Sequence, residues 1–445
     1  MDTMLPDTYQ YTFETLGREQ GDRQPDWLRD MRKEALALFS EIGFPTTRDE
    51  EWKYTNVSAL AKVPFQRLVP DGEEDSASLA TVIDAIYPDL QASKLVFVDG
   101  RFSAALSDGA SDVDGLSVES LAGTLASAPD RVVPHLGQSV AFRKNAFTAL
   151  NTALFEDGAL VSVDAECILA QPIHLVFIAT ARQADTMSHV RNLILAGKNS
   201  QATVLESYVS LGDQSTLTNV VTELAAEEGA KLHHYKNQRE HGGAYHVATT
   251  GVHQCAHSQV SLVSVSTGSL LARHDIHVTL DGQEAECSLN GLYMGKSSQH
   301  VDFHTRIVHA SPHTRSRELF KGVLTDKARG VFNGAIMVPR DAQKVDSQMT
   351  NNNLLLSRDA EIDTKPELEI YADDVKCAHG ATIGQLDETA IFYLRTRGIG
   401  RNEARGILTE AFALELLESI GNDVVRHEID RQVLAWLPHE ESQGS

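Results

Sequence analysis

Cysteine is scarce in this sequence: Cys167, Cys255, Cys287 and Cys377 are the four in 445 residues. That number is too small for a disulfide framework. The absence of any C-x-x-C pair excludes a classical zinc ribbon and a thioredoxin-type motif. Basic residues are also few, since 39 Lys and Arg against 62 Asp and Glu give a net charge of −23. This balance argues against a dedicated nucleic-acid binder, whose phosphate contacts need basic surface.

Long apolar runs are missing as well. The most apolar stretch, residues 167–181, is too short to span a bilayer and contains Gln171, Pro172 and His174. The N-terminal residues lack the basic and apolar regions of a secretory signal, and their acidic residues fit a transit peptide poorly. We therefore expect a cytoplasmic protein in a reducing compartment, with no membrane segment.

The composition is that of a globular protein, with 42% hydrophobic and 23% charged residues, and the length suggests about three domains. Residues 1–145 are predicted to be mostly helical, with one helix starting at Asp26 and stopped by Gly43. A hairpin is expected through Asp99-Gly100, and an acidic surface loop around residues 71–80. Residues 146–383 form a β core, and residues 384–445 form a helical domain with period-3.6 patterning.

The β core consists of short runs rich in Val, Thr, Ser, Ile and Leu, many of which alternate at period two. So many strands must avoid exposing long unpaired edges. A sandwich, a barrel, a propeller and a β-solenoid all do this. No fixed-length motif of the WD or kelch kind is present. Near-continuous strands, with the Asn351-Asn352-Asn353 run expected at a turn, favour a β-helix modestly over a sandwich.

The segment Gly291 to Ser297, GLYMGKS, imitates a phosphate-binding loop. A P-loop needs four residues between its glycines and a helix after them, whereas this segment has three and is followed by strand-like alternation. We expect a turn between strands here, and no ATP binding by the chain alone.

Histidine is concentrated in one region, with twelve of the 18 between His233 and His313. On a strand, His253, Cys255 and His257 would share one face, as a metal-binding trio would. Polar residues at period two are also typical of a solvated sheet face, and the residues alone favour that interpretation over the metal site.

Residues 365–387, KPELEIYADDVKCAHGATIGQLD, carry the densest local signature. Cys377 and His379 are two apart, so on a strand both project to one side. A protonated histidine or Lys376 nearby would favour the thiolate form of Cys377. The pair lacks the orienting third residue of a hydrolytic site. Because iron–sulfur clusters normally take four ligands, a cluster here would need ligands from another chain. Without further information, a packed cysteine beside an exposed histidine is the favoured interpretation of the pair.

This segment, followed by FYLRTRGI, resembles the SufD family, a scaffold subunit of SUF iron–sulfur cluster assembly. TRDEEWKYTNVSAL from Thr47, ALNTALFEDGALV from Ala149, QPIHLVFIA from Gln171 and SRELFKGVLTDKARGVFNGAIMV from Ser316 resemble the same family. The resemblance covers about residues 45–421. The K-C-A-H-G form around Cys377 favours SufD over its paralogue SufB.

The resemblance implies a mainly β fold, a right-handed parallel β-helix between an N-terminal helical region and a C-terminal helical domain. It also implies pairing with SufB, recruitment of the ATPase SufC, and sulfur supplied by a cysteine desulfurase. No catalytic activity of its own is implied. His379 falls on the family histidine implicated in assembling a transient cluster at the SufB interface, with Cys377 as its neighbour. Reduced flavin is associated with the assembled scaffold, but no flavin site can be placed on this chain.

The C-terminal helical domain is the expected SufC docking surface. A basic cluster there adjoins an amphipathic helix, and a cationic rim around an apolar stripe suits docking. The residues are Arg395, Arg397, Arg401, Arg405, Ile407, Leu408 and Phe412. Two other functions remain open: a stand-alone β-helix enzyme acting on polysaccharide, and a metal-binding protein that uses the histidine-rich region 233–313. The sequence also leaves open whether the isolated chain is a homodimer.

Overall fold

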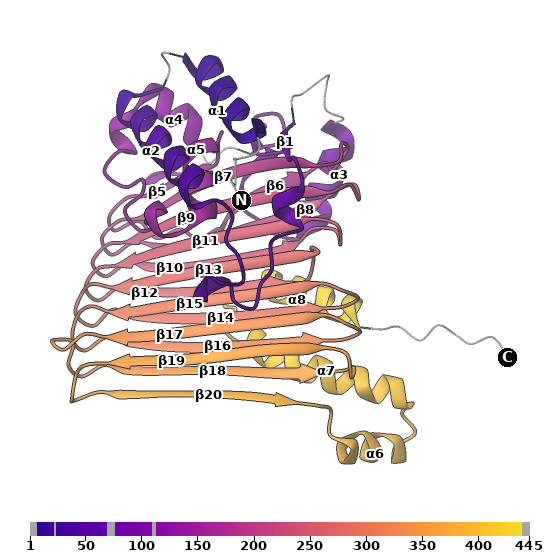
Figure 1. The fold of residues 1–445 in the computed structure, drawn as a ribbon. Helices are drawn as coiled ribbons and strands as arrows, with labels where there is room; N and C mark the ends of the chain where they lie inside the picture. Colours follow the sequence, from indigo (N-terminus) through magenta and orange to yellow (C-terminus); the bar gives the residue numbers. More distant parts are fainter. Residues whose placement is uncertain (1–6, 22–23, 69–75, 109–112, 438–445) are drawn as a thin grey trace.

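The computed structural model describes residues 7–21, 24–68, 76–108 and 113–437 (Figure 1). Its centre is a stack of coils, in which successive strands alternate between two sheets of mostly parallel strands. The strands with odd numbers from β5 to β19 form sheet A, and those with even numbers from β6 to β20 form sheet B. The predicted parallel β-helix, with helical segments on both sides of it in the sequence, is confirmed.

The strands of the two sheets have similar lengths. Sheet A contains β5 (Ala159–Val163), β7 (Thr186–Ala196), β9 (Thr216–Ala226), β11 (Tyr245–Gln254), β13 (Leu271–Leu280), β15 (His300–His309), β17 (Arg329–Val338) and β19 (Glu361–Ile370). Sheet B contains β6 (Ile173–Ala179), β8 (Gln201–Ser210), β10 (Lys231–Arg239), β12 (Gln259–Ser266), β14 (Glu286–Gly295), β16 (Arg315–Leu324), β18 (Asp346–Leu355) and β20 (Lys376–Gly384).

Period-two alternation builds the core between the sheets. On β15, for example, Val301, Phe303 and Ile307 point inward and belong to one continuous apolar cluster that fills the solenoid. Coil length varies, because residues that pair in neighbouring coils are not always the same number of positions apart. Arg315 and its partner Asp346 are further apart in the sequence than Gln259 and its partner Glu286. Because the coils differ in length, the sequence shows strands without a fixed repeat.

The N-terminal region is mixed rather than purely helical, because some of its strands extend the two sheets. β2 pairs with β6 in sheet B, and β4 pairs with β5 in sheet A. The elements are α1 (Asp7–Gln20), α2 (Asp26–Ile42), η2 (Glu50–Trp52), η3 (Leu60–Lys62), β1 (Gln66–Arg67), α3 (Ser76–Ile86), β2 (Ser93–Val98), β3 (Arg101–Phe102), β4 (Leu116–Ser120), α4 (Leu121–Ser127), η4 (Pro129–Arg131), η5 (Phe142–Lys144) and α5 (Ala146–Leu154).

Two local predictions in this region are confirmed. The helix that starts at Asp26 is α2, and Gly43 follows it with a positive φ of 65°. The hairpin through Asp99-Gly100 joins β2 to β3. The expected acidic loop is wrong for residues 76–80, which form the start of α3, and its residues 71–75 lie outside the described residues.

The C-terminal helices are α6 (Glu388–Thr396), α7 (Arg401–Leu417) and α8 (Asp423–Trp436). α7 and α8 cover the outer face of sheet B, whereas α6 lies beyond the end of β20 (Figure 1). The apolar residues of this contact include Leu416, Leu417, Ile429 and Val433 on the helices and Val263, Leu292 and Val323 on the strands. α7 and α8 are therefore integral to the fold.

Two predicted turns lie within strands instead. Asn351, Asn352 and Asn353 belong to β18, and buried Asn353 donates a 2.7 Å hydrogen bond to the buried Asn351 amide oxygen. The hydroxyl of the buried Tyr293 donates to the Asn353 amide oxygen and accepts a hydrogen bond from Asn351 Nδ2 (3.2 Å). These bonds remove the usual penalty for burying asparagine.

The glycines of the P-loop imitation lie in β14, so the expected turn begins only at Lys296. A Cβ at position 291 would lie 2.0 Å from the ring of Phe320, which packs directly against this glycine. β15 follows, without the helix that a phosphate-binding loop requires. Gly291 is therefore explained by close packing in the core.

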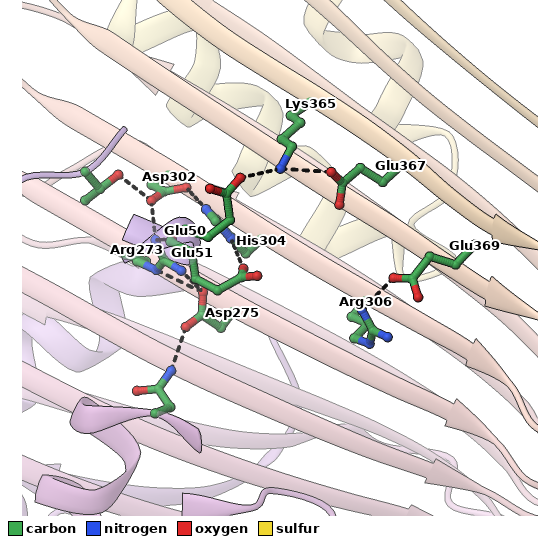
Figure 2. A network of polar contacts seen from close by, with 12 residues as sticks. Glu50, Glu51, Arg273, Asp275, Asp302, His304, Arg306, Lys365, Glu367 and Glu369 are labelled. Carbon is green, nitrogen blue, oxygen red and sulfur yellow. Dashed lines mark hydrogen bonds and ion pairs between the residues drawn. The ribbon is translucent and has the colours of Figure 1, made fainter. Parts of the chain in front are cut away.

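The segment around η2 lies against the outer face of sheet A (Figure 2). Glu50 forms a 2.8 Å ion pair with Lys365 on β19, and Trp52 stacks 3.8 Å from the guanidinium of Arg273 on β13. Arg273 is buried and donates to the carboxylates of Asp275 (2.9 Å) and Asp302 (2.8 Å). These contacts attach the TRDEEWKY motif to the coils near the C-terminal end of the solenoid.

His304 on β15 completes this network (Figure 2). Its Nε2 lies 3.1 Å from Asp302 Oδ1, and its Nδ1 lies 3.2 Å from Glu51 Oε2. Burial opposes protonation of the ring, but the carboxylate of Asp302 outweighs it and raises the pKa of His304 to about 9. His304 is therefore charged at neutral pH.

The His304 ion pairs should make stability fall at alkaline pH. The pKa of His304 is raised on folding, so its contribution is complete below about pH 6.5 and is lost as the pH rises through about 9. We expect the loss to be about 2 kcal/mol, seen as a lower melting temperature at pH 9.5 than at pH 7. His304→Gln should show a smaller difference. His253→Gln, at a half-buried histidine of β11, is the control, and an identical pH response in all three proteins would contradict the assignment.

Candidate functional site

Cys377 and His379 lie on β20, the last strand of the solenoid. β20 pairs in parallel with β18, which aligns Cys377 with Ser347 and His379 with Met349. Ser347 and Met349 are buried inward-facing residues of β18. Both residues of β20 therefore project to the inner face of the solenoid, on the same side as their spacing predicts.

Two columns of inward-facing side chains end at these residues. One runs through Cys287, Ser316 and Ser347 to Cys377, and Ser316 Oγ lies 2.6 Å from Ser347 Oγ. The other runs through Leu289, Glu318 and Met349 to His379. Burial raises the pKa of Glu318 to about 8, so this side chain is neutral at pH 7. Sequence analysis missed these columns, because they depend on which coil lies beside which.

This end of the solenoid is open in the described part of the chain. β19 and β20 are the last strands of their sheets, and each pairs with a described strand on one side only. His379 is exposed, Cys377 is half-buried, and Ile383 on the same strand is exposed despite being apolar. Unpaired strand edges beside an uncovered core face are a template for pairing with another chain.

The isolated chain does not activate Cys377. Partial burial raises the pKa of the Cys377 thiol, and the nearby Asp346 carboxylate raises it further. The expectation that Lys376 or a protonated histidine favours the thiolate is therefore wrong for this chain alone. At neutral pH Cys377 is a thiol, and a positive charge or a metal ion must come from elsewhere to ionise it.

The proposed trio His253, Cys255 and His257 does not share a strand face. β11 ends at Gln254, and His257 lies in the following turn with a positive φ of 58°. His253 pairs with Asp281 at 3.1 Å, and His257 pairs with Glu284 at 3.4 Å. The three residues are thus separated by a turn whose backbone geometry the sequence did not reveal.

Several histidines of the region 233–313 are buried in the solenoid. His234 lies 3.1 Å from Glu206, and His274 contacts Thr250 at 2.8 Å. Burial opposes ionisation of Glu206, but His234 outweighs it and lowers the pKa of Glu206 to about 2. Nowhere in the described ranges do three His, Cys, Asp or Glu side chains converge as a metal-binding group. These histidines take part in buried hydrogen bonds and ion pairs.

The four arginines of the predicted docking cluster have different environments. Arg401 forms a 2.7 Å ion pair with Glu388, and Arg405 donates inward to the carbonyl of Leu356 (3.1 Å). Arg395 and Arg397 are exposed, and Arg397 donates to the hydroxyl of Tyr393 (2.8 Å). The outward-facing positive charge is thus concentrated at the end of α6.

The apolar residues of the predicted docking surface also differ in how far they are exposed. Phe412 is half-buried, with Lys321 Nζ 4.6 Å from its ring centre and bonded to its carbonyl at 2.8 Å. Leu408 is half-buried and Ile407 is exposed. Sequence analysis missed Phe392 and Tyr393 on α6, which are 66% and 57% exposed. Both lie in the FYLRTRGI motif, so the signal was present in the sequence.

None of the helices in the described ranges has the length and apolar character needed to cross a membrane.

The chain matches two family models that together cover most of its length. Residues 177–412 match "SUF system FeS cluster assembly, SufBD core domain", and residues 6–175 match "SufBD protein N-terminal region".

Curated relatives agree with these matches. An iron–sulfur cluster assembly SufBD family protein of Synechocystis is 34% identical over 88% of this chain and 87% of its own length. The iron–sulfur cluster assembly protein SufD of Escherichia coli is 33% identical over 91% of this chain and 92% of its own. SufD of Bacillus subtilis is 23% identical over 92% and 93%.

The raised pKa of Cys377 can be tested by alkylation. In the isolated chain at pH 7.5, iodoacetamide should modify Cys377 more slowly than it modifies free cysteine, because the thiolate is the nucleophile. The rate should rise steeply with pH and show an apparent pKa above the usual thiol value. Mass spectrometry of the Cys377 peptide measures the rate at each pH. Rapid alkylation at pH 7 would show instead that the chain activates this thiol.

Proposed function

Because the chain belongs to the SufBD family of iron–sulfur cluster assembly proteins, we propose that it is a non-catalytic scaffold subunit of the SUF system. In this proposal it pairs with SufB, recruits the ATPase SufC, and contributes one or two ligands to a nascent cluster. The cluster is cargo that is built and then passed on. The observation that carries the proposal is the open solenoid end, where Cys377 and His379 lie on the last strand.

SufB would pair along the edges of β19 and β20. These edges offer backbone N–H and C=O groups, and the exposed Ile383 lies beside them. Pairing with another solenoid would satisfy the edge groups and cover the apolar face. In this proposal a second copy of this chain pairs along the same edges when SufB is absent, so the isolated protein would form a homodimer.

The cluster site would then be shared between two chains. His379 and Cys377 supply at most two ligands, and iron–sulfur clusters usually need four. Cysteine thiolates of SufB would complete the set. His379 is the stronger candidate of the two, because Cys377 is a protonated thiol in the isolated chain. A neutral imidazole binds iron less firmly than a thiolate does, which suits a cluster that must be released.

SufC would dock on a surface formed by α6 and the start of α7. This docking surface combines exposed aromatic rings, positive charge and one exposed aliphatic residue, and it lies beside the open end (Figure 1). Its residues are Phe392, Tyr393, Arg395, Arg397 and Ile407. Aromatic and arginine side chains are the common anchors of protein interfaces. Motion of SufC on ATP binding could thus reach the shared cluster site.

The remaining partner acts indirectly. A cysteine desulfurase would supply sulfur to the assembled scaffold, with no chemistry required from this chain. Reduced flavin belongs, in this proposal, to the assembled complex, and we assign no residue of this chain to it.

His379→Ala should lower the iron and sulfide content of the co-expressed complex several-fold without preventing its assembly. The side chain is exposed, so its loss should cost little stability. The measurement is anaerobic reconstitution of the complex with SufB and SufC, followed by iron and sulfide assays. Cys377→Ala should have a milder effect.

Thr382→Ala is the matched control, because Thr382 lies on the same strand and its hydroxyl bonds to Asn352. It should keep the wild-type cluster content. Full cluster content in His379→Ala would show that this histidine is not a ligand. A complex that fails to assemble would instead place its role in the interface.

Replacing both Phe392 and Tyr393 by serine should weaken SufC binding by about tenfold or more, since exposed aromatic residues are typical binding hot spots. Pull-down of SufC and titration of the purified proteins measure the effect, and circular dichroism checks folding. Leu434→Ser is the control, at an exposed apolar residue of α8. Unchanged SufC affinity in the double variant would refute this docking surface.

A further inference from the structure

A cavity of about 150 Å³ lies between the end of α1, the first half of α2 and α4. These helices are at the end of the solenoid away from β20 (Figure 1). Its described lining includes Gln24, Leu28, Arg32, Ala122, Leu125 and Glu156. A cavity of this volume holds a molecule of about six non-hydrogen atoms. It is separate from the cluster site and from the SufC docking surface.

Arg32 is a buried cation that forms no ion pair with a described residue, although the carboxylate of Glu156 is near enough to raise its pKa and so offset part of the effect of burial. It is only 4% exposed, and its guanidinium lies 4.1 Å from the centre of the Phe155 ring. Nη1 donates to the carbonyl of Ala153 (3.2 Å), but Nε is buried and finds no described partner. Burial lowers the pKa of Arg32 to about 9, which still leaves it charged at neutral pH. An unpaired buried charge is strongly destabilising.

The other charged residue of the lining is already compensated. The carboxylate of Glu156 forms ion pairs with Arg67 (3.2 Å) and Arg101 (3.0 Å). Nearby Asp157 accepts hydrogen bonds from Ser120 and from the backbone of Ala122. Glu156 therefore acts on Arg32 without forming an ion pair with it, and the hydrogen-bond donors of Arg32 stay without a described carboxylate partner.

A second donor faces the same cavity. Gln24 is 8% exposed, and its Nε2 is buried without a described hydrogen-bond partner. Two unpaired donors, one of them charged, suit a planar carboxylate, which accepts hydrogen bonds at both oxygens. Leu28, Ala122 and Leu125 make much of the remaining wall apolar, beside Gln20 and the ion-paired Glu156, and this apolar part disfavours a small hydrophilic anion such as phosphate.

We propose that this cavity binds a small aliphatic monocarboxylate, with its carboxylate on Arg32 and Gln24 and its hydrocarbon chain against Leu28 and Leu125. A purely structural role accounts for only some of the hydrogen-bond donors of Arg32. The bond to the Ala153 carbonyl caps the last turn of α5, but it uses one of five guanidinium donors. A bound carboxylate would satisfy the remaining positive charge.

The test is titration of the full chain with sodium butyrate, which has six non-hydrogen atoms, followed by calorimetry and melting temperature. We expect saturable binding and a rise in melting temperature. Inorganic phosphate and butylammonium should produce neither effect. Arg32→Met should weaken butyrate binding by about tenfold or more, because it removes the charge-assisted hydrogen bonds.

Two further variants keep the test decisive if Arg32→Met folds poorly. Ala122→Leu places extra carbon atoms in the cavity while Arg32 stays in place, and it should also abolish binding. Lys33→Met removes an exposed cation one residue along α2 and should leave binding unchanged. Absence of saturable butyrate binding in the millimolar range, or equal binding by Ala122→Leu, would overturn the proposal. Neither result would bear on the cluster site.

Discussion

Parallel strand pairing holds the coils of this protein together, and such pairing always leaves an edge at each end of the stack. At the N-terminal end, the last strand of each sheet is antiparallel to its neighbour: β4 pairs with β5, and β3 pairs with β2. At the other end, β19 and β20 have no further described strand beside them. The edge strands are therefore short at the N-terminal end and long at the other, where β19 and β20 offer most of the backbone available for pairing. The proposed partner and the proposed ligands both follow from this asymmetry.

Buried charges attach the N-terminal region to the outer face of sheet A. Arg191 pairs with Glu223, whose carboxylate also accepts hydrogen bonds from the backbone of Gly137 (2.8 Å) and Ser139 (2.9 Å). Arg273 pairs with Asp302 under Trp52. Removing one member of such a pair leaves the other charge buried and unpaired, at a cost of about 3–5 kcal/mol. The networks fix one arrangement of the N-terminal segment over the sheet. Arg32, by contrast, forms no ion pair with a described residue.

The C-terminal helices include some that pack on the solenoid and one that is exposed for a proposed partner, and their sequence patterns do not distinguish the two. α7 and α8 bury an apolar face on sheet B and so belong to the solenoid core. α6 leaves Phe392 and Tyr393 exposed beside Arg395 and Arg397. Amphipathic patterning is the same whether a helix packs on its own sheet or on another protein. Only the position of each helix relative to the sheet distinguishes the two.

The local period-two and period-3.6 patterns of the sequence determined the mainly β core, the helix that starts at Asp26, and the shared face of Cys377 and His379. The β-helix among the possible β folds came from the resemblance to the SufD family. The sequence did not determine that Asn351 lies inside a strand, that His257 lies in a turn, or that Met349 lies next to His379. Those facts depend on which residues of successive coils align, and coil length varies along the chain. Tertiary structure alone decided this register, since backbone pairing joins residues about thirty positions apart whose side chains carry no mark of their partners.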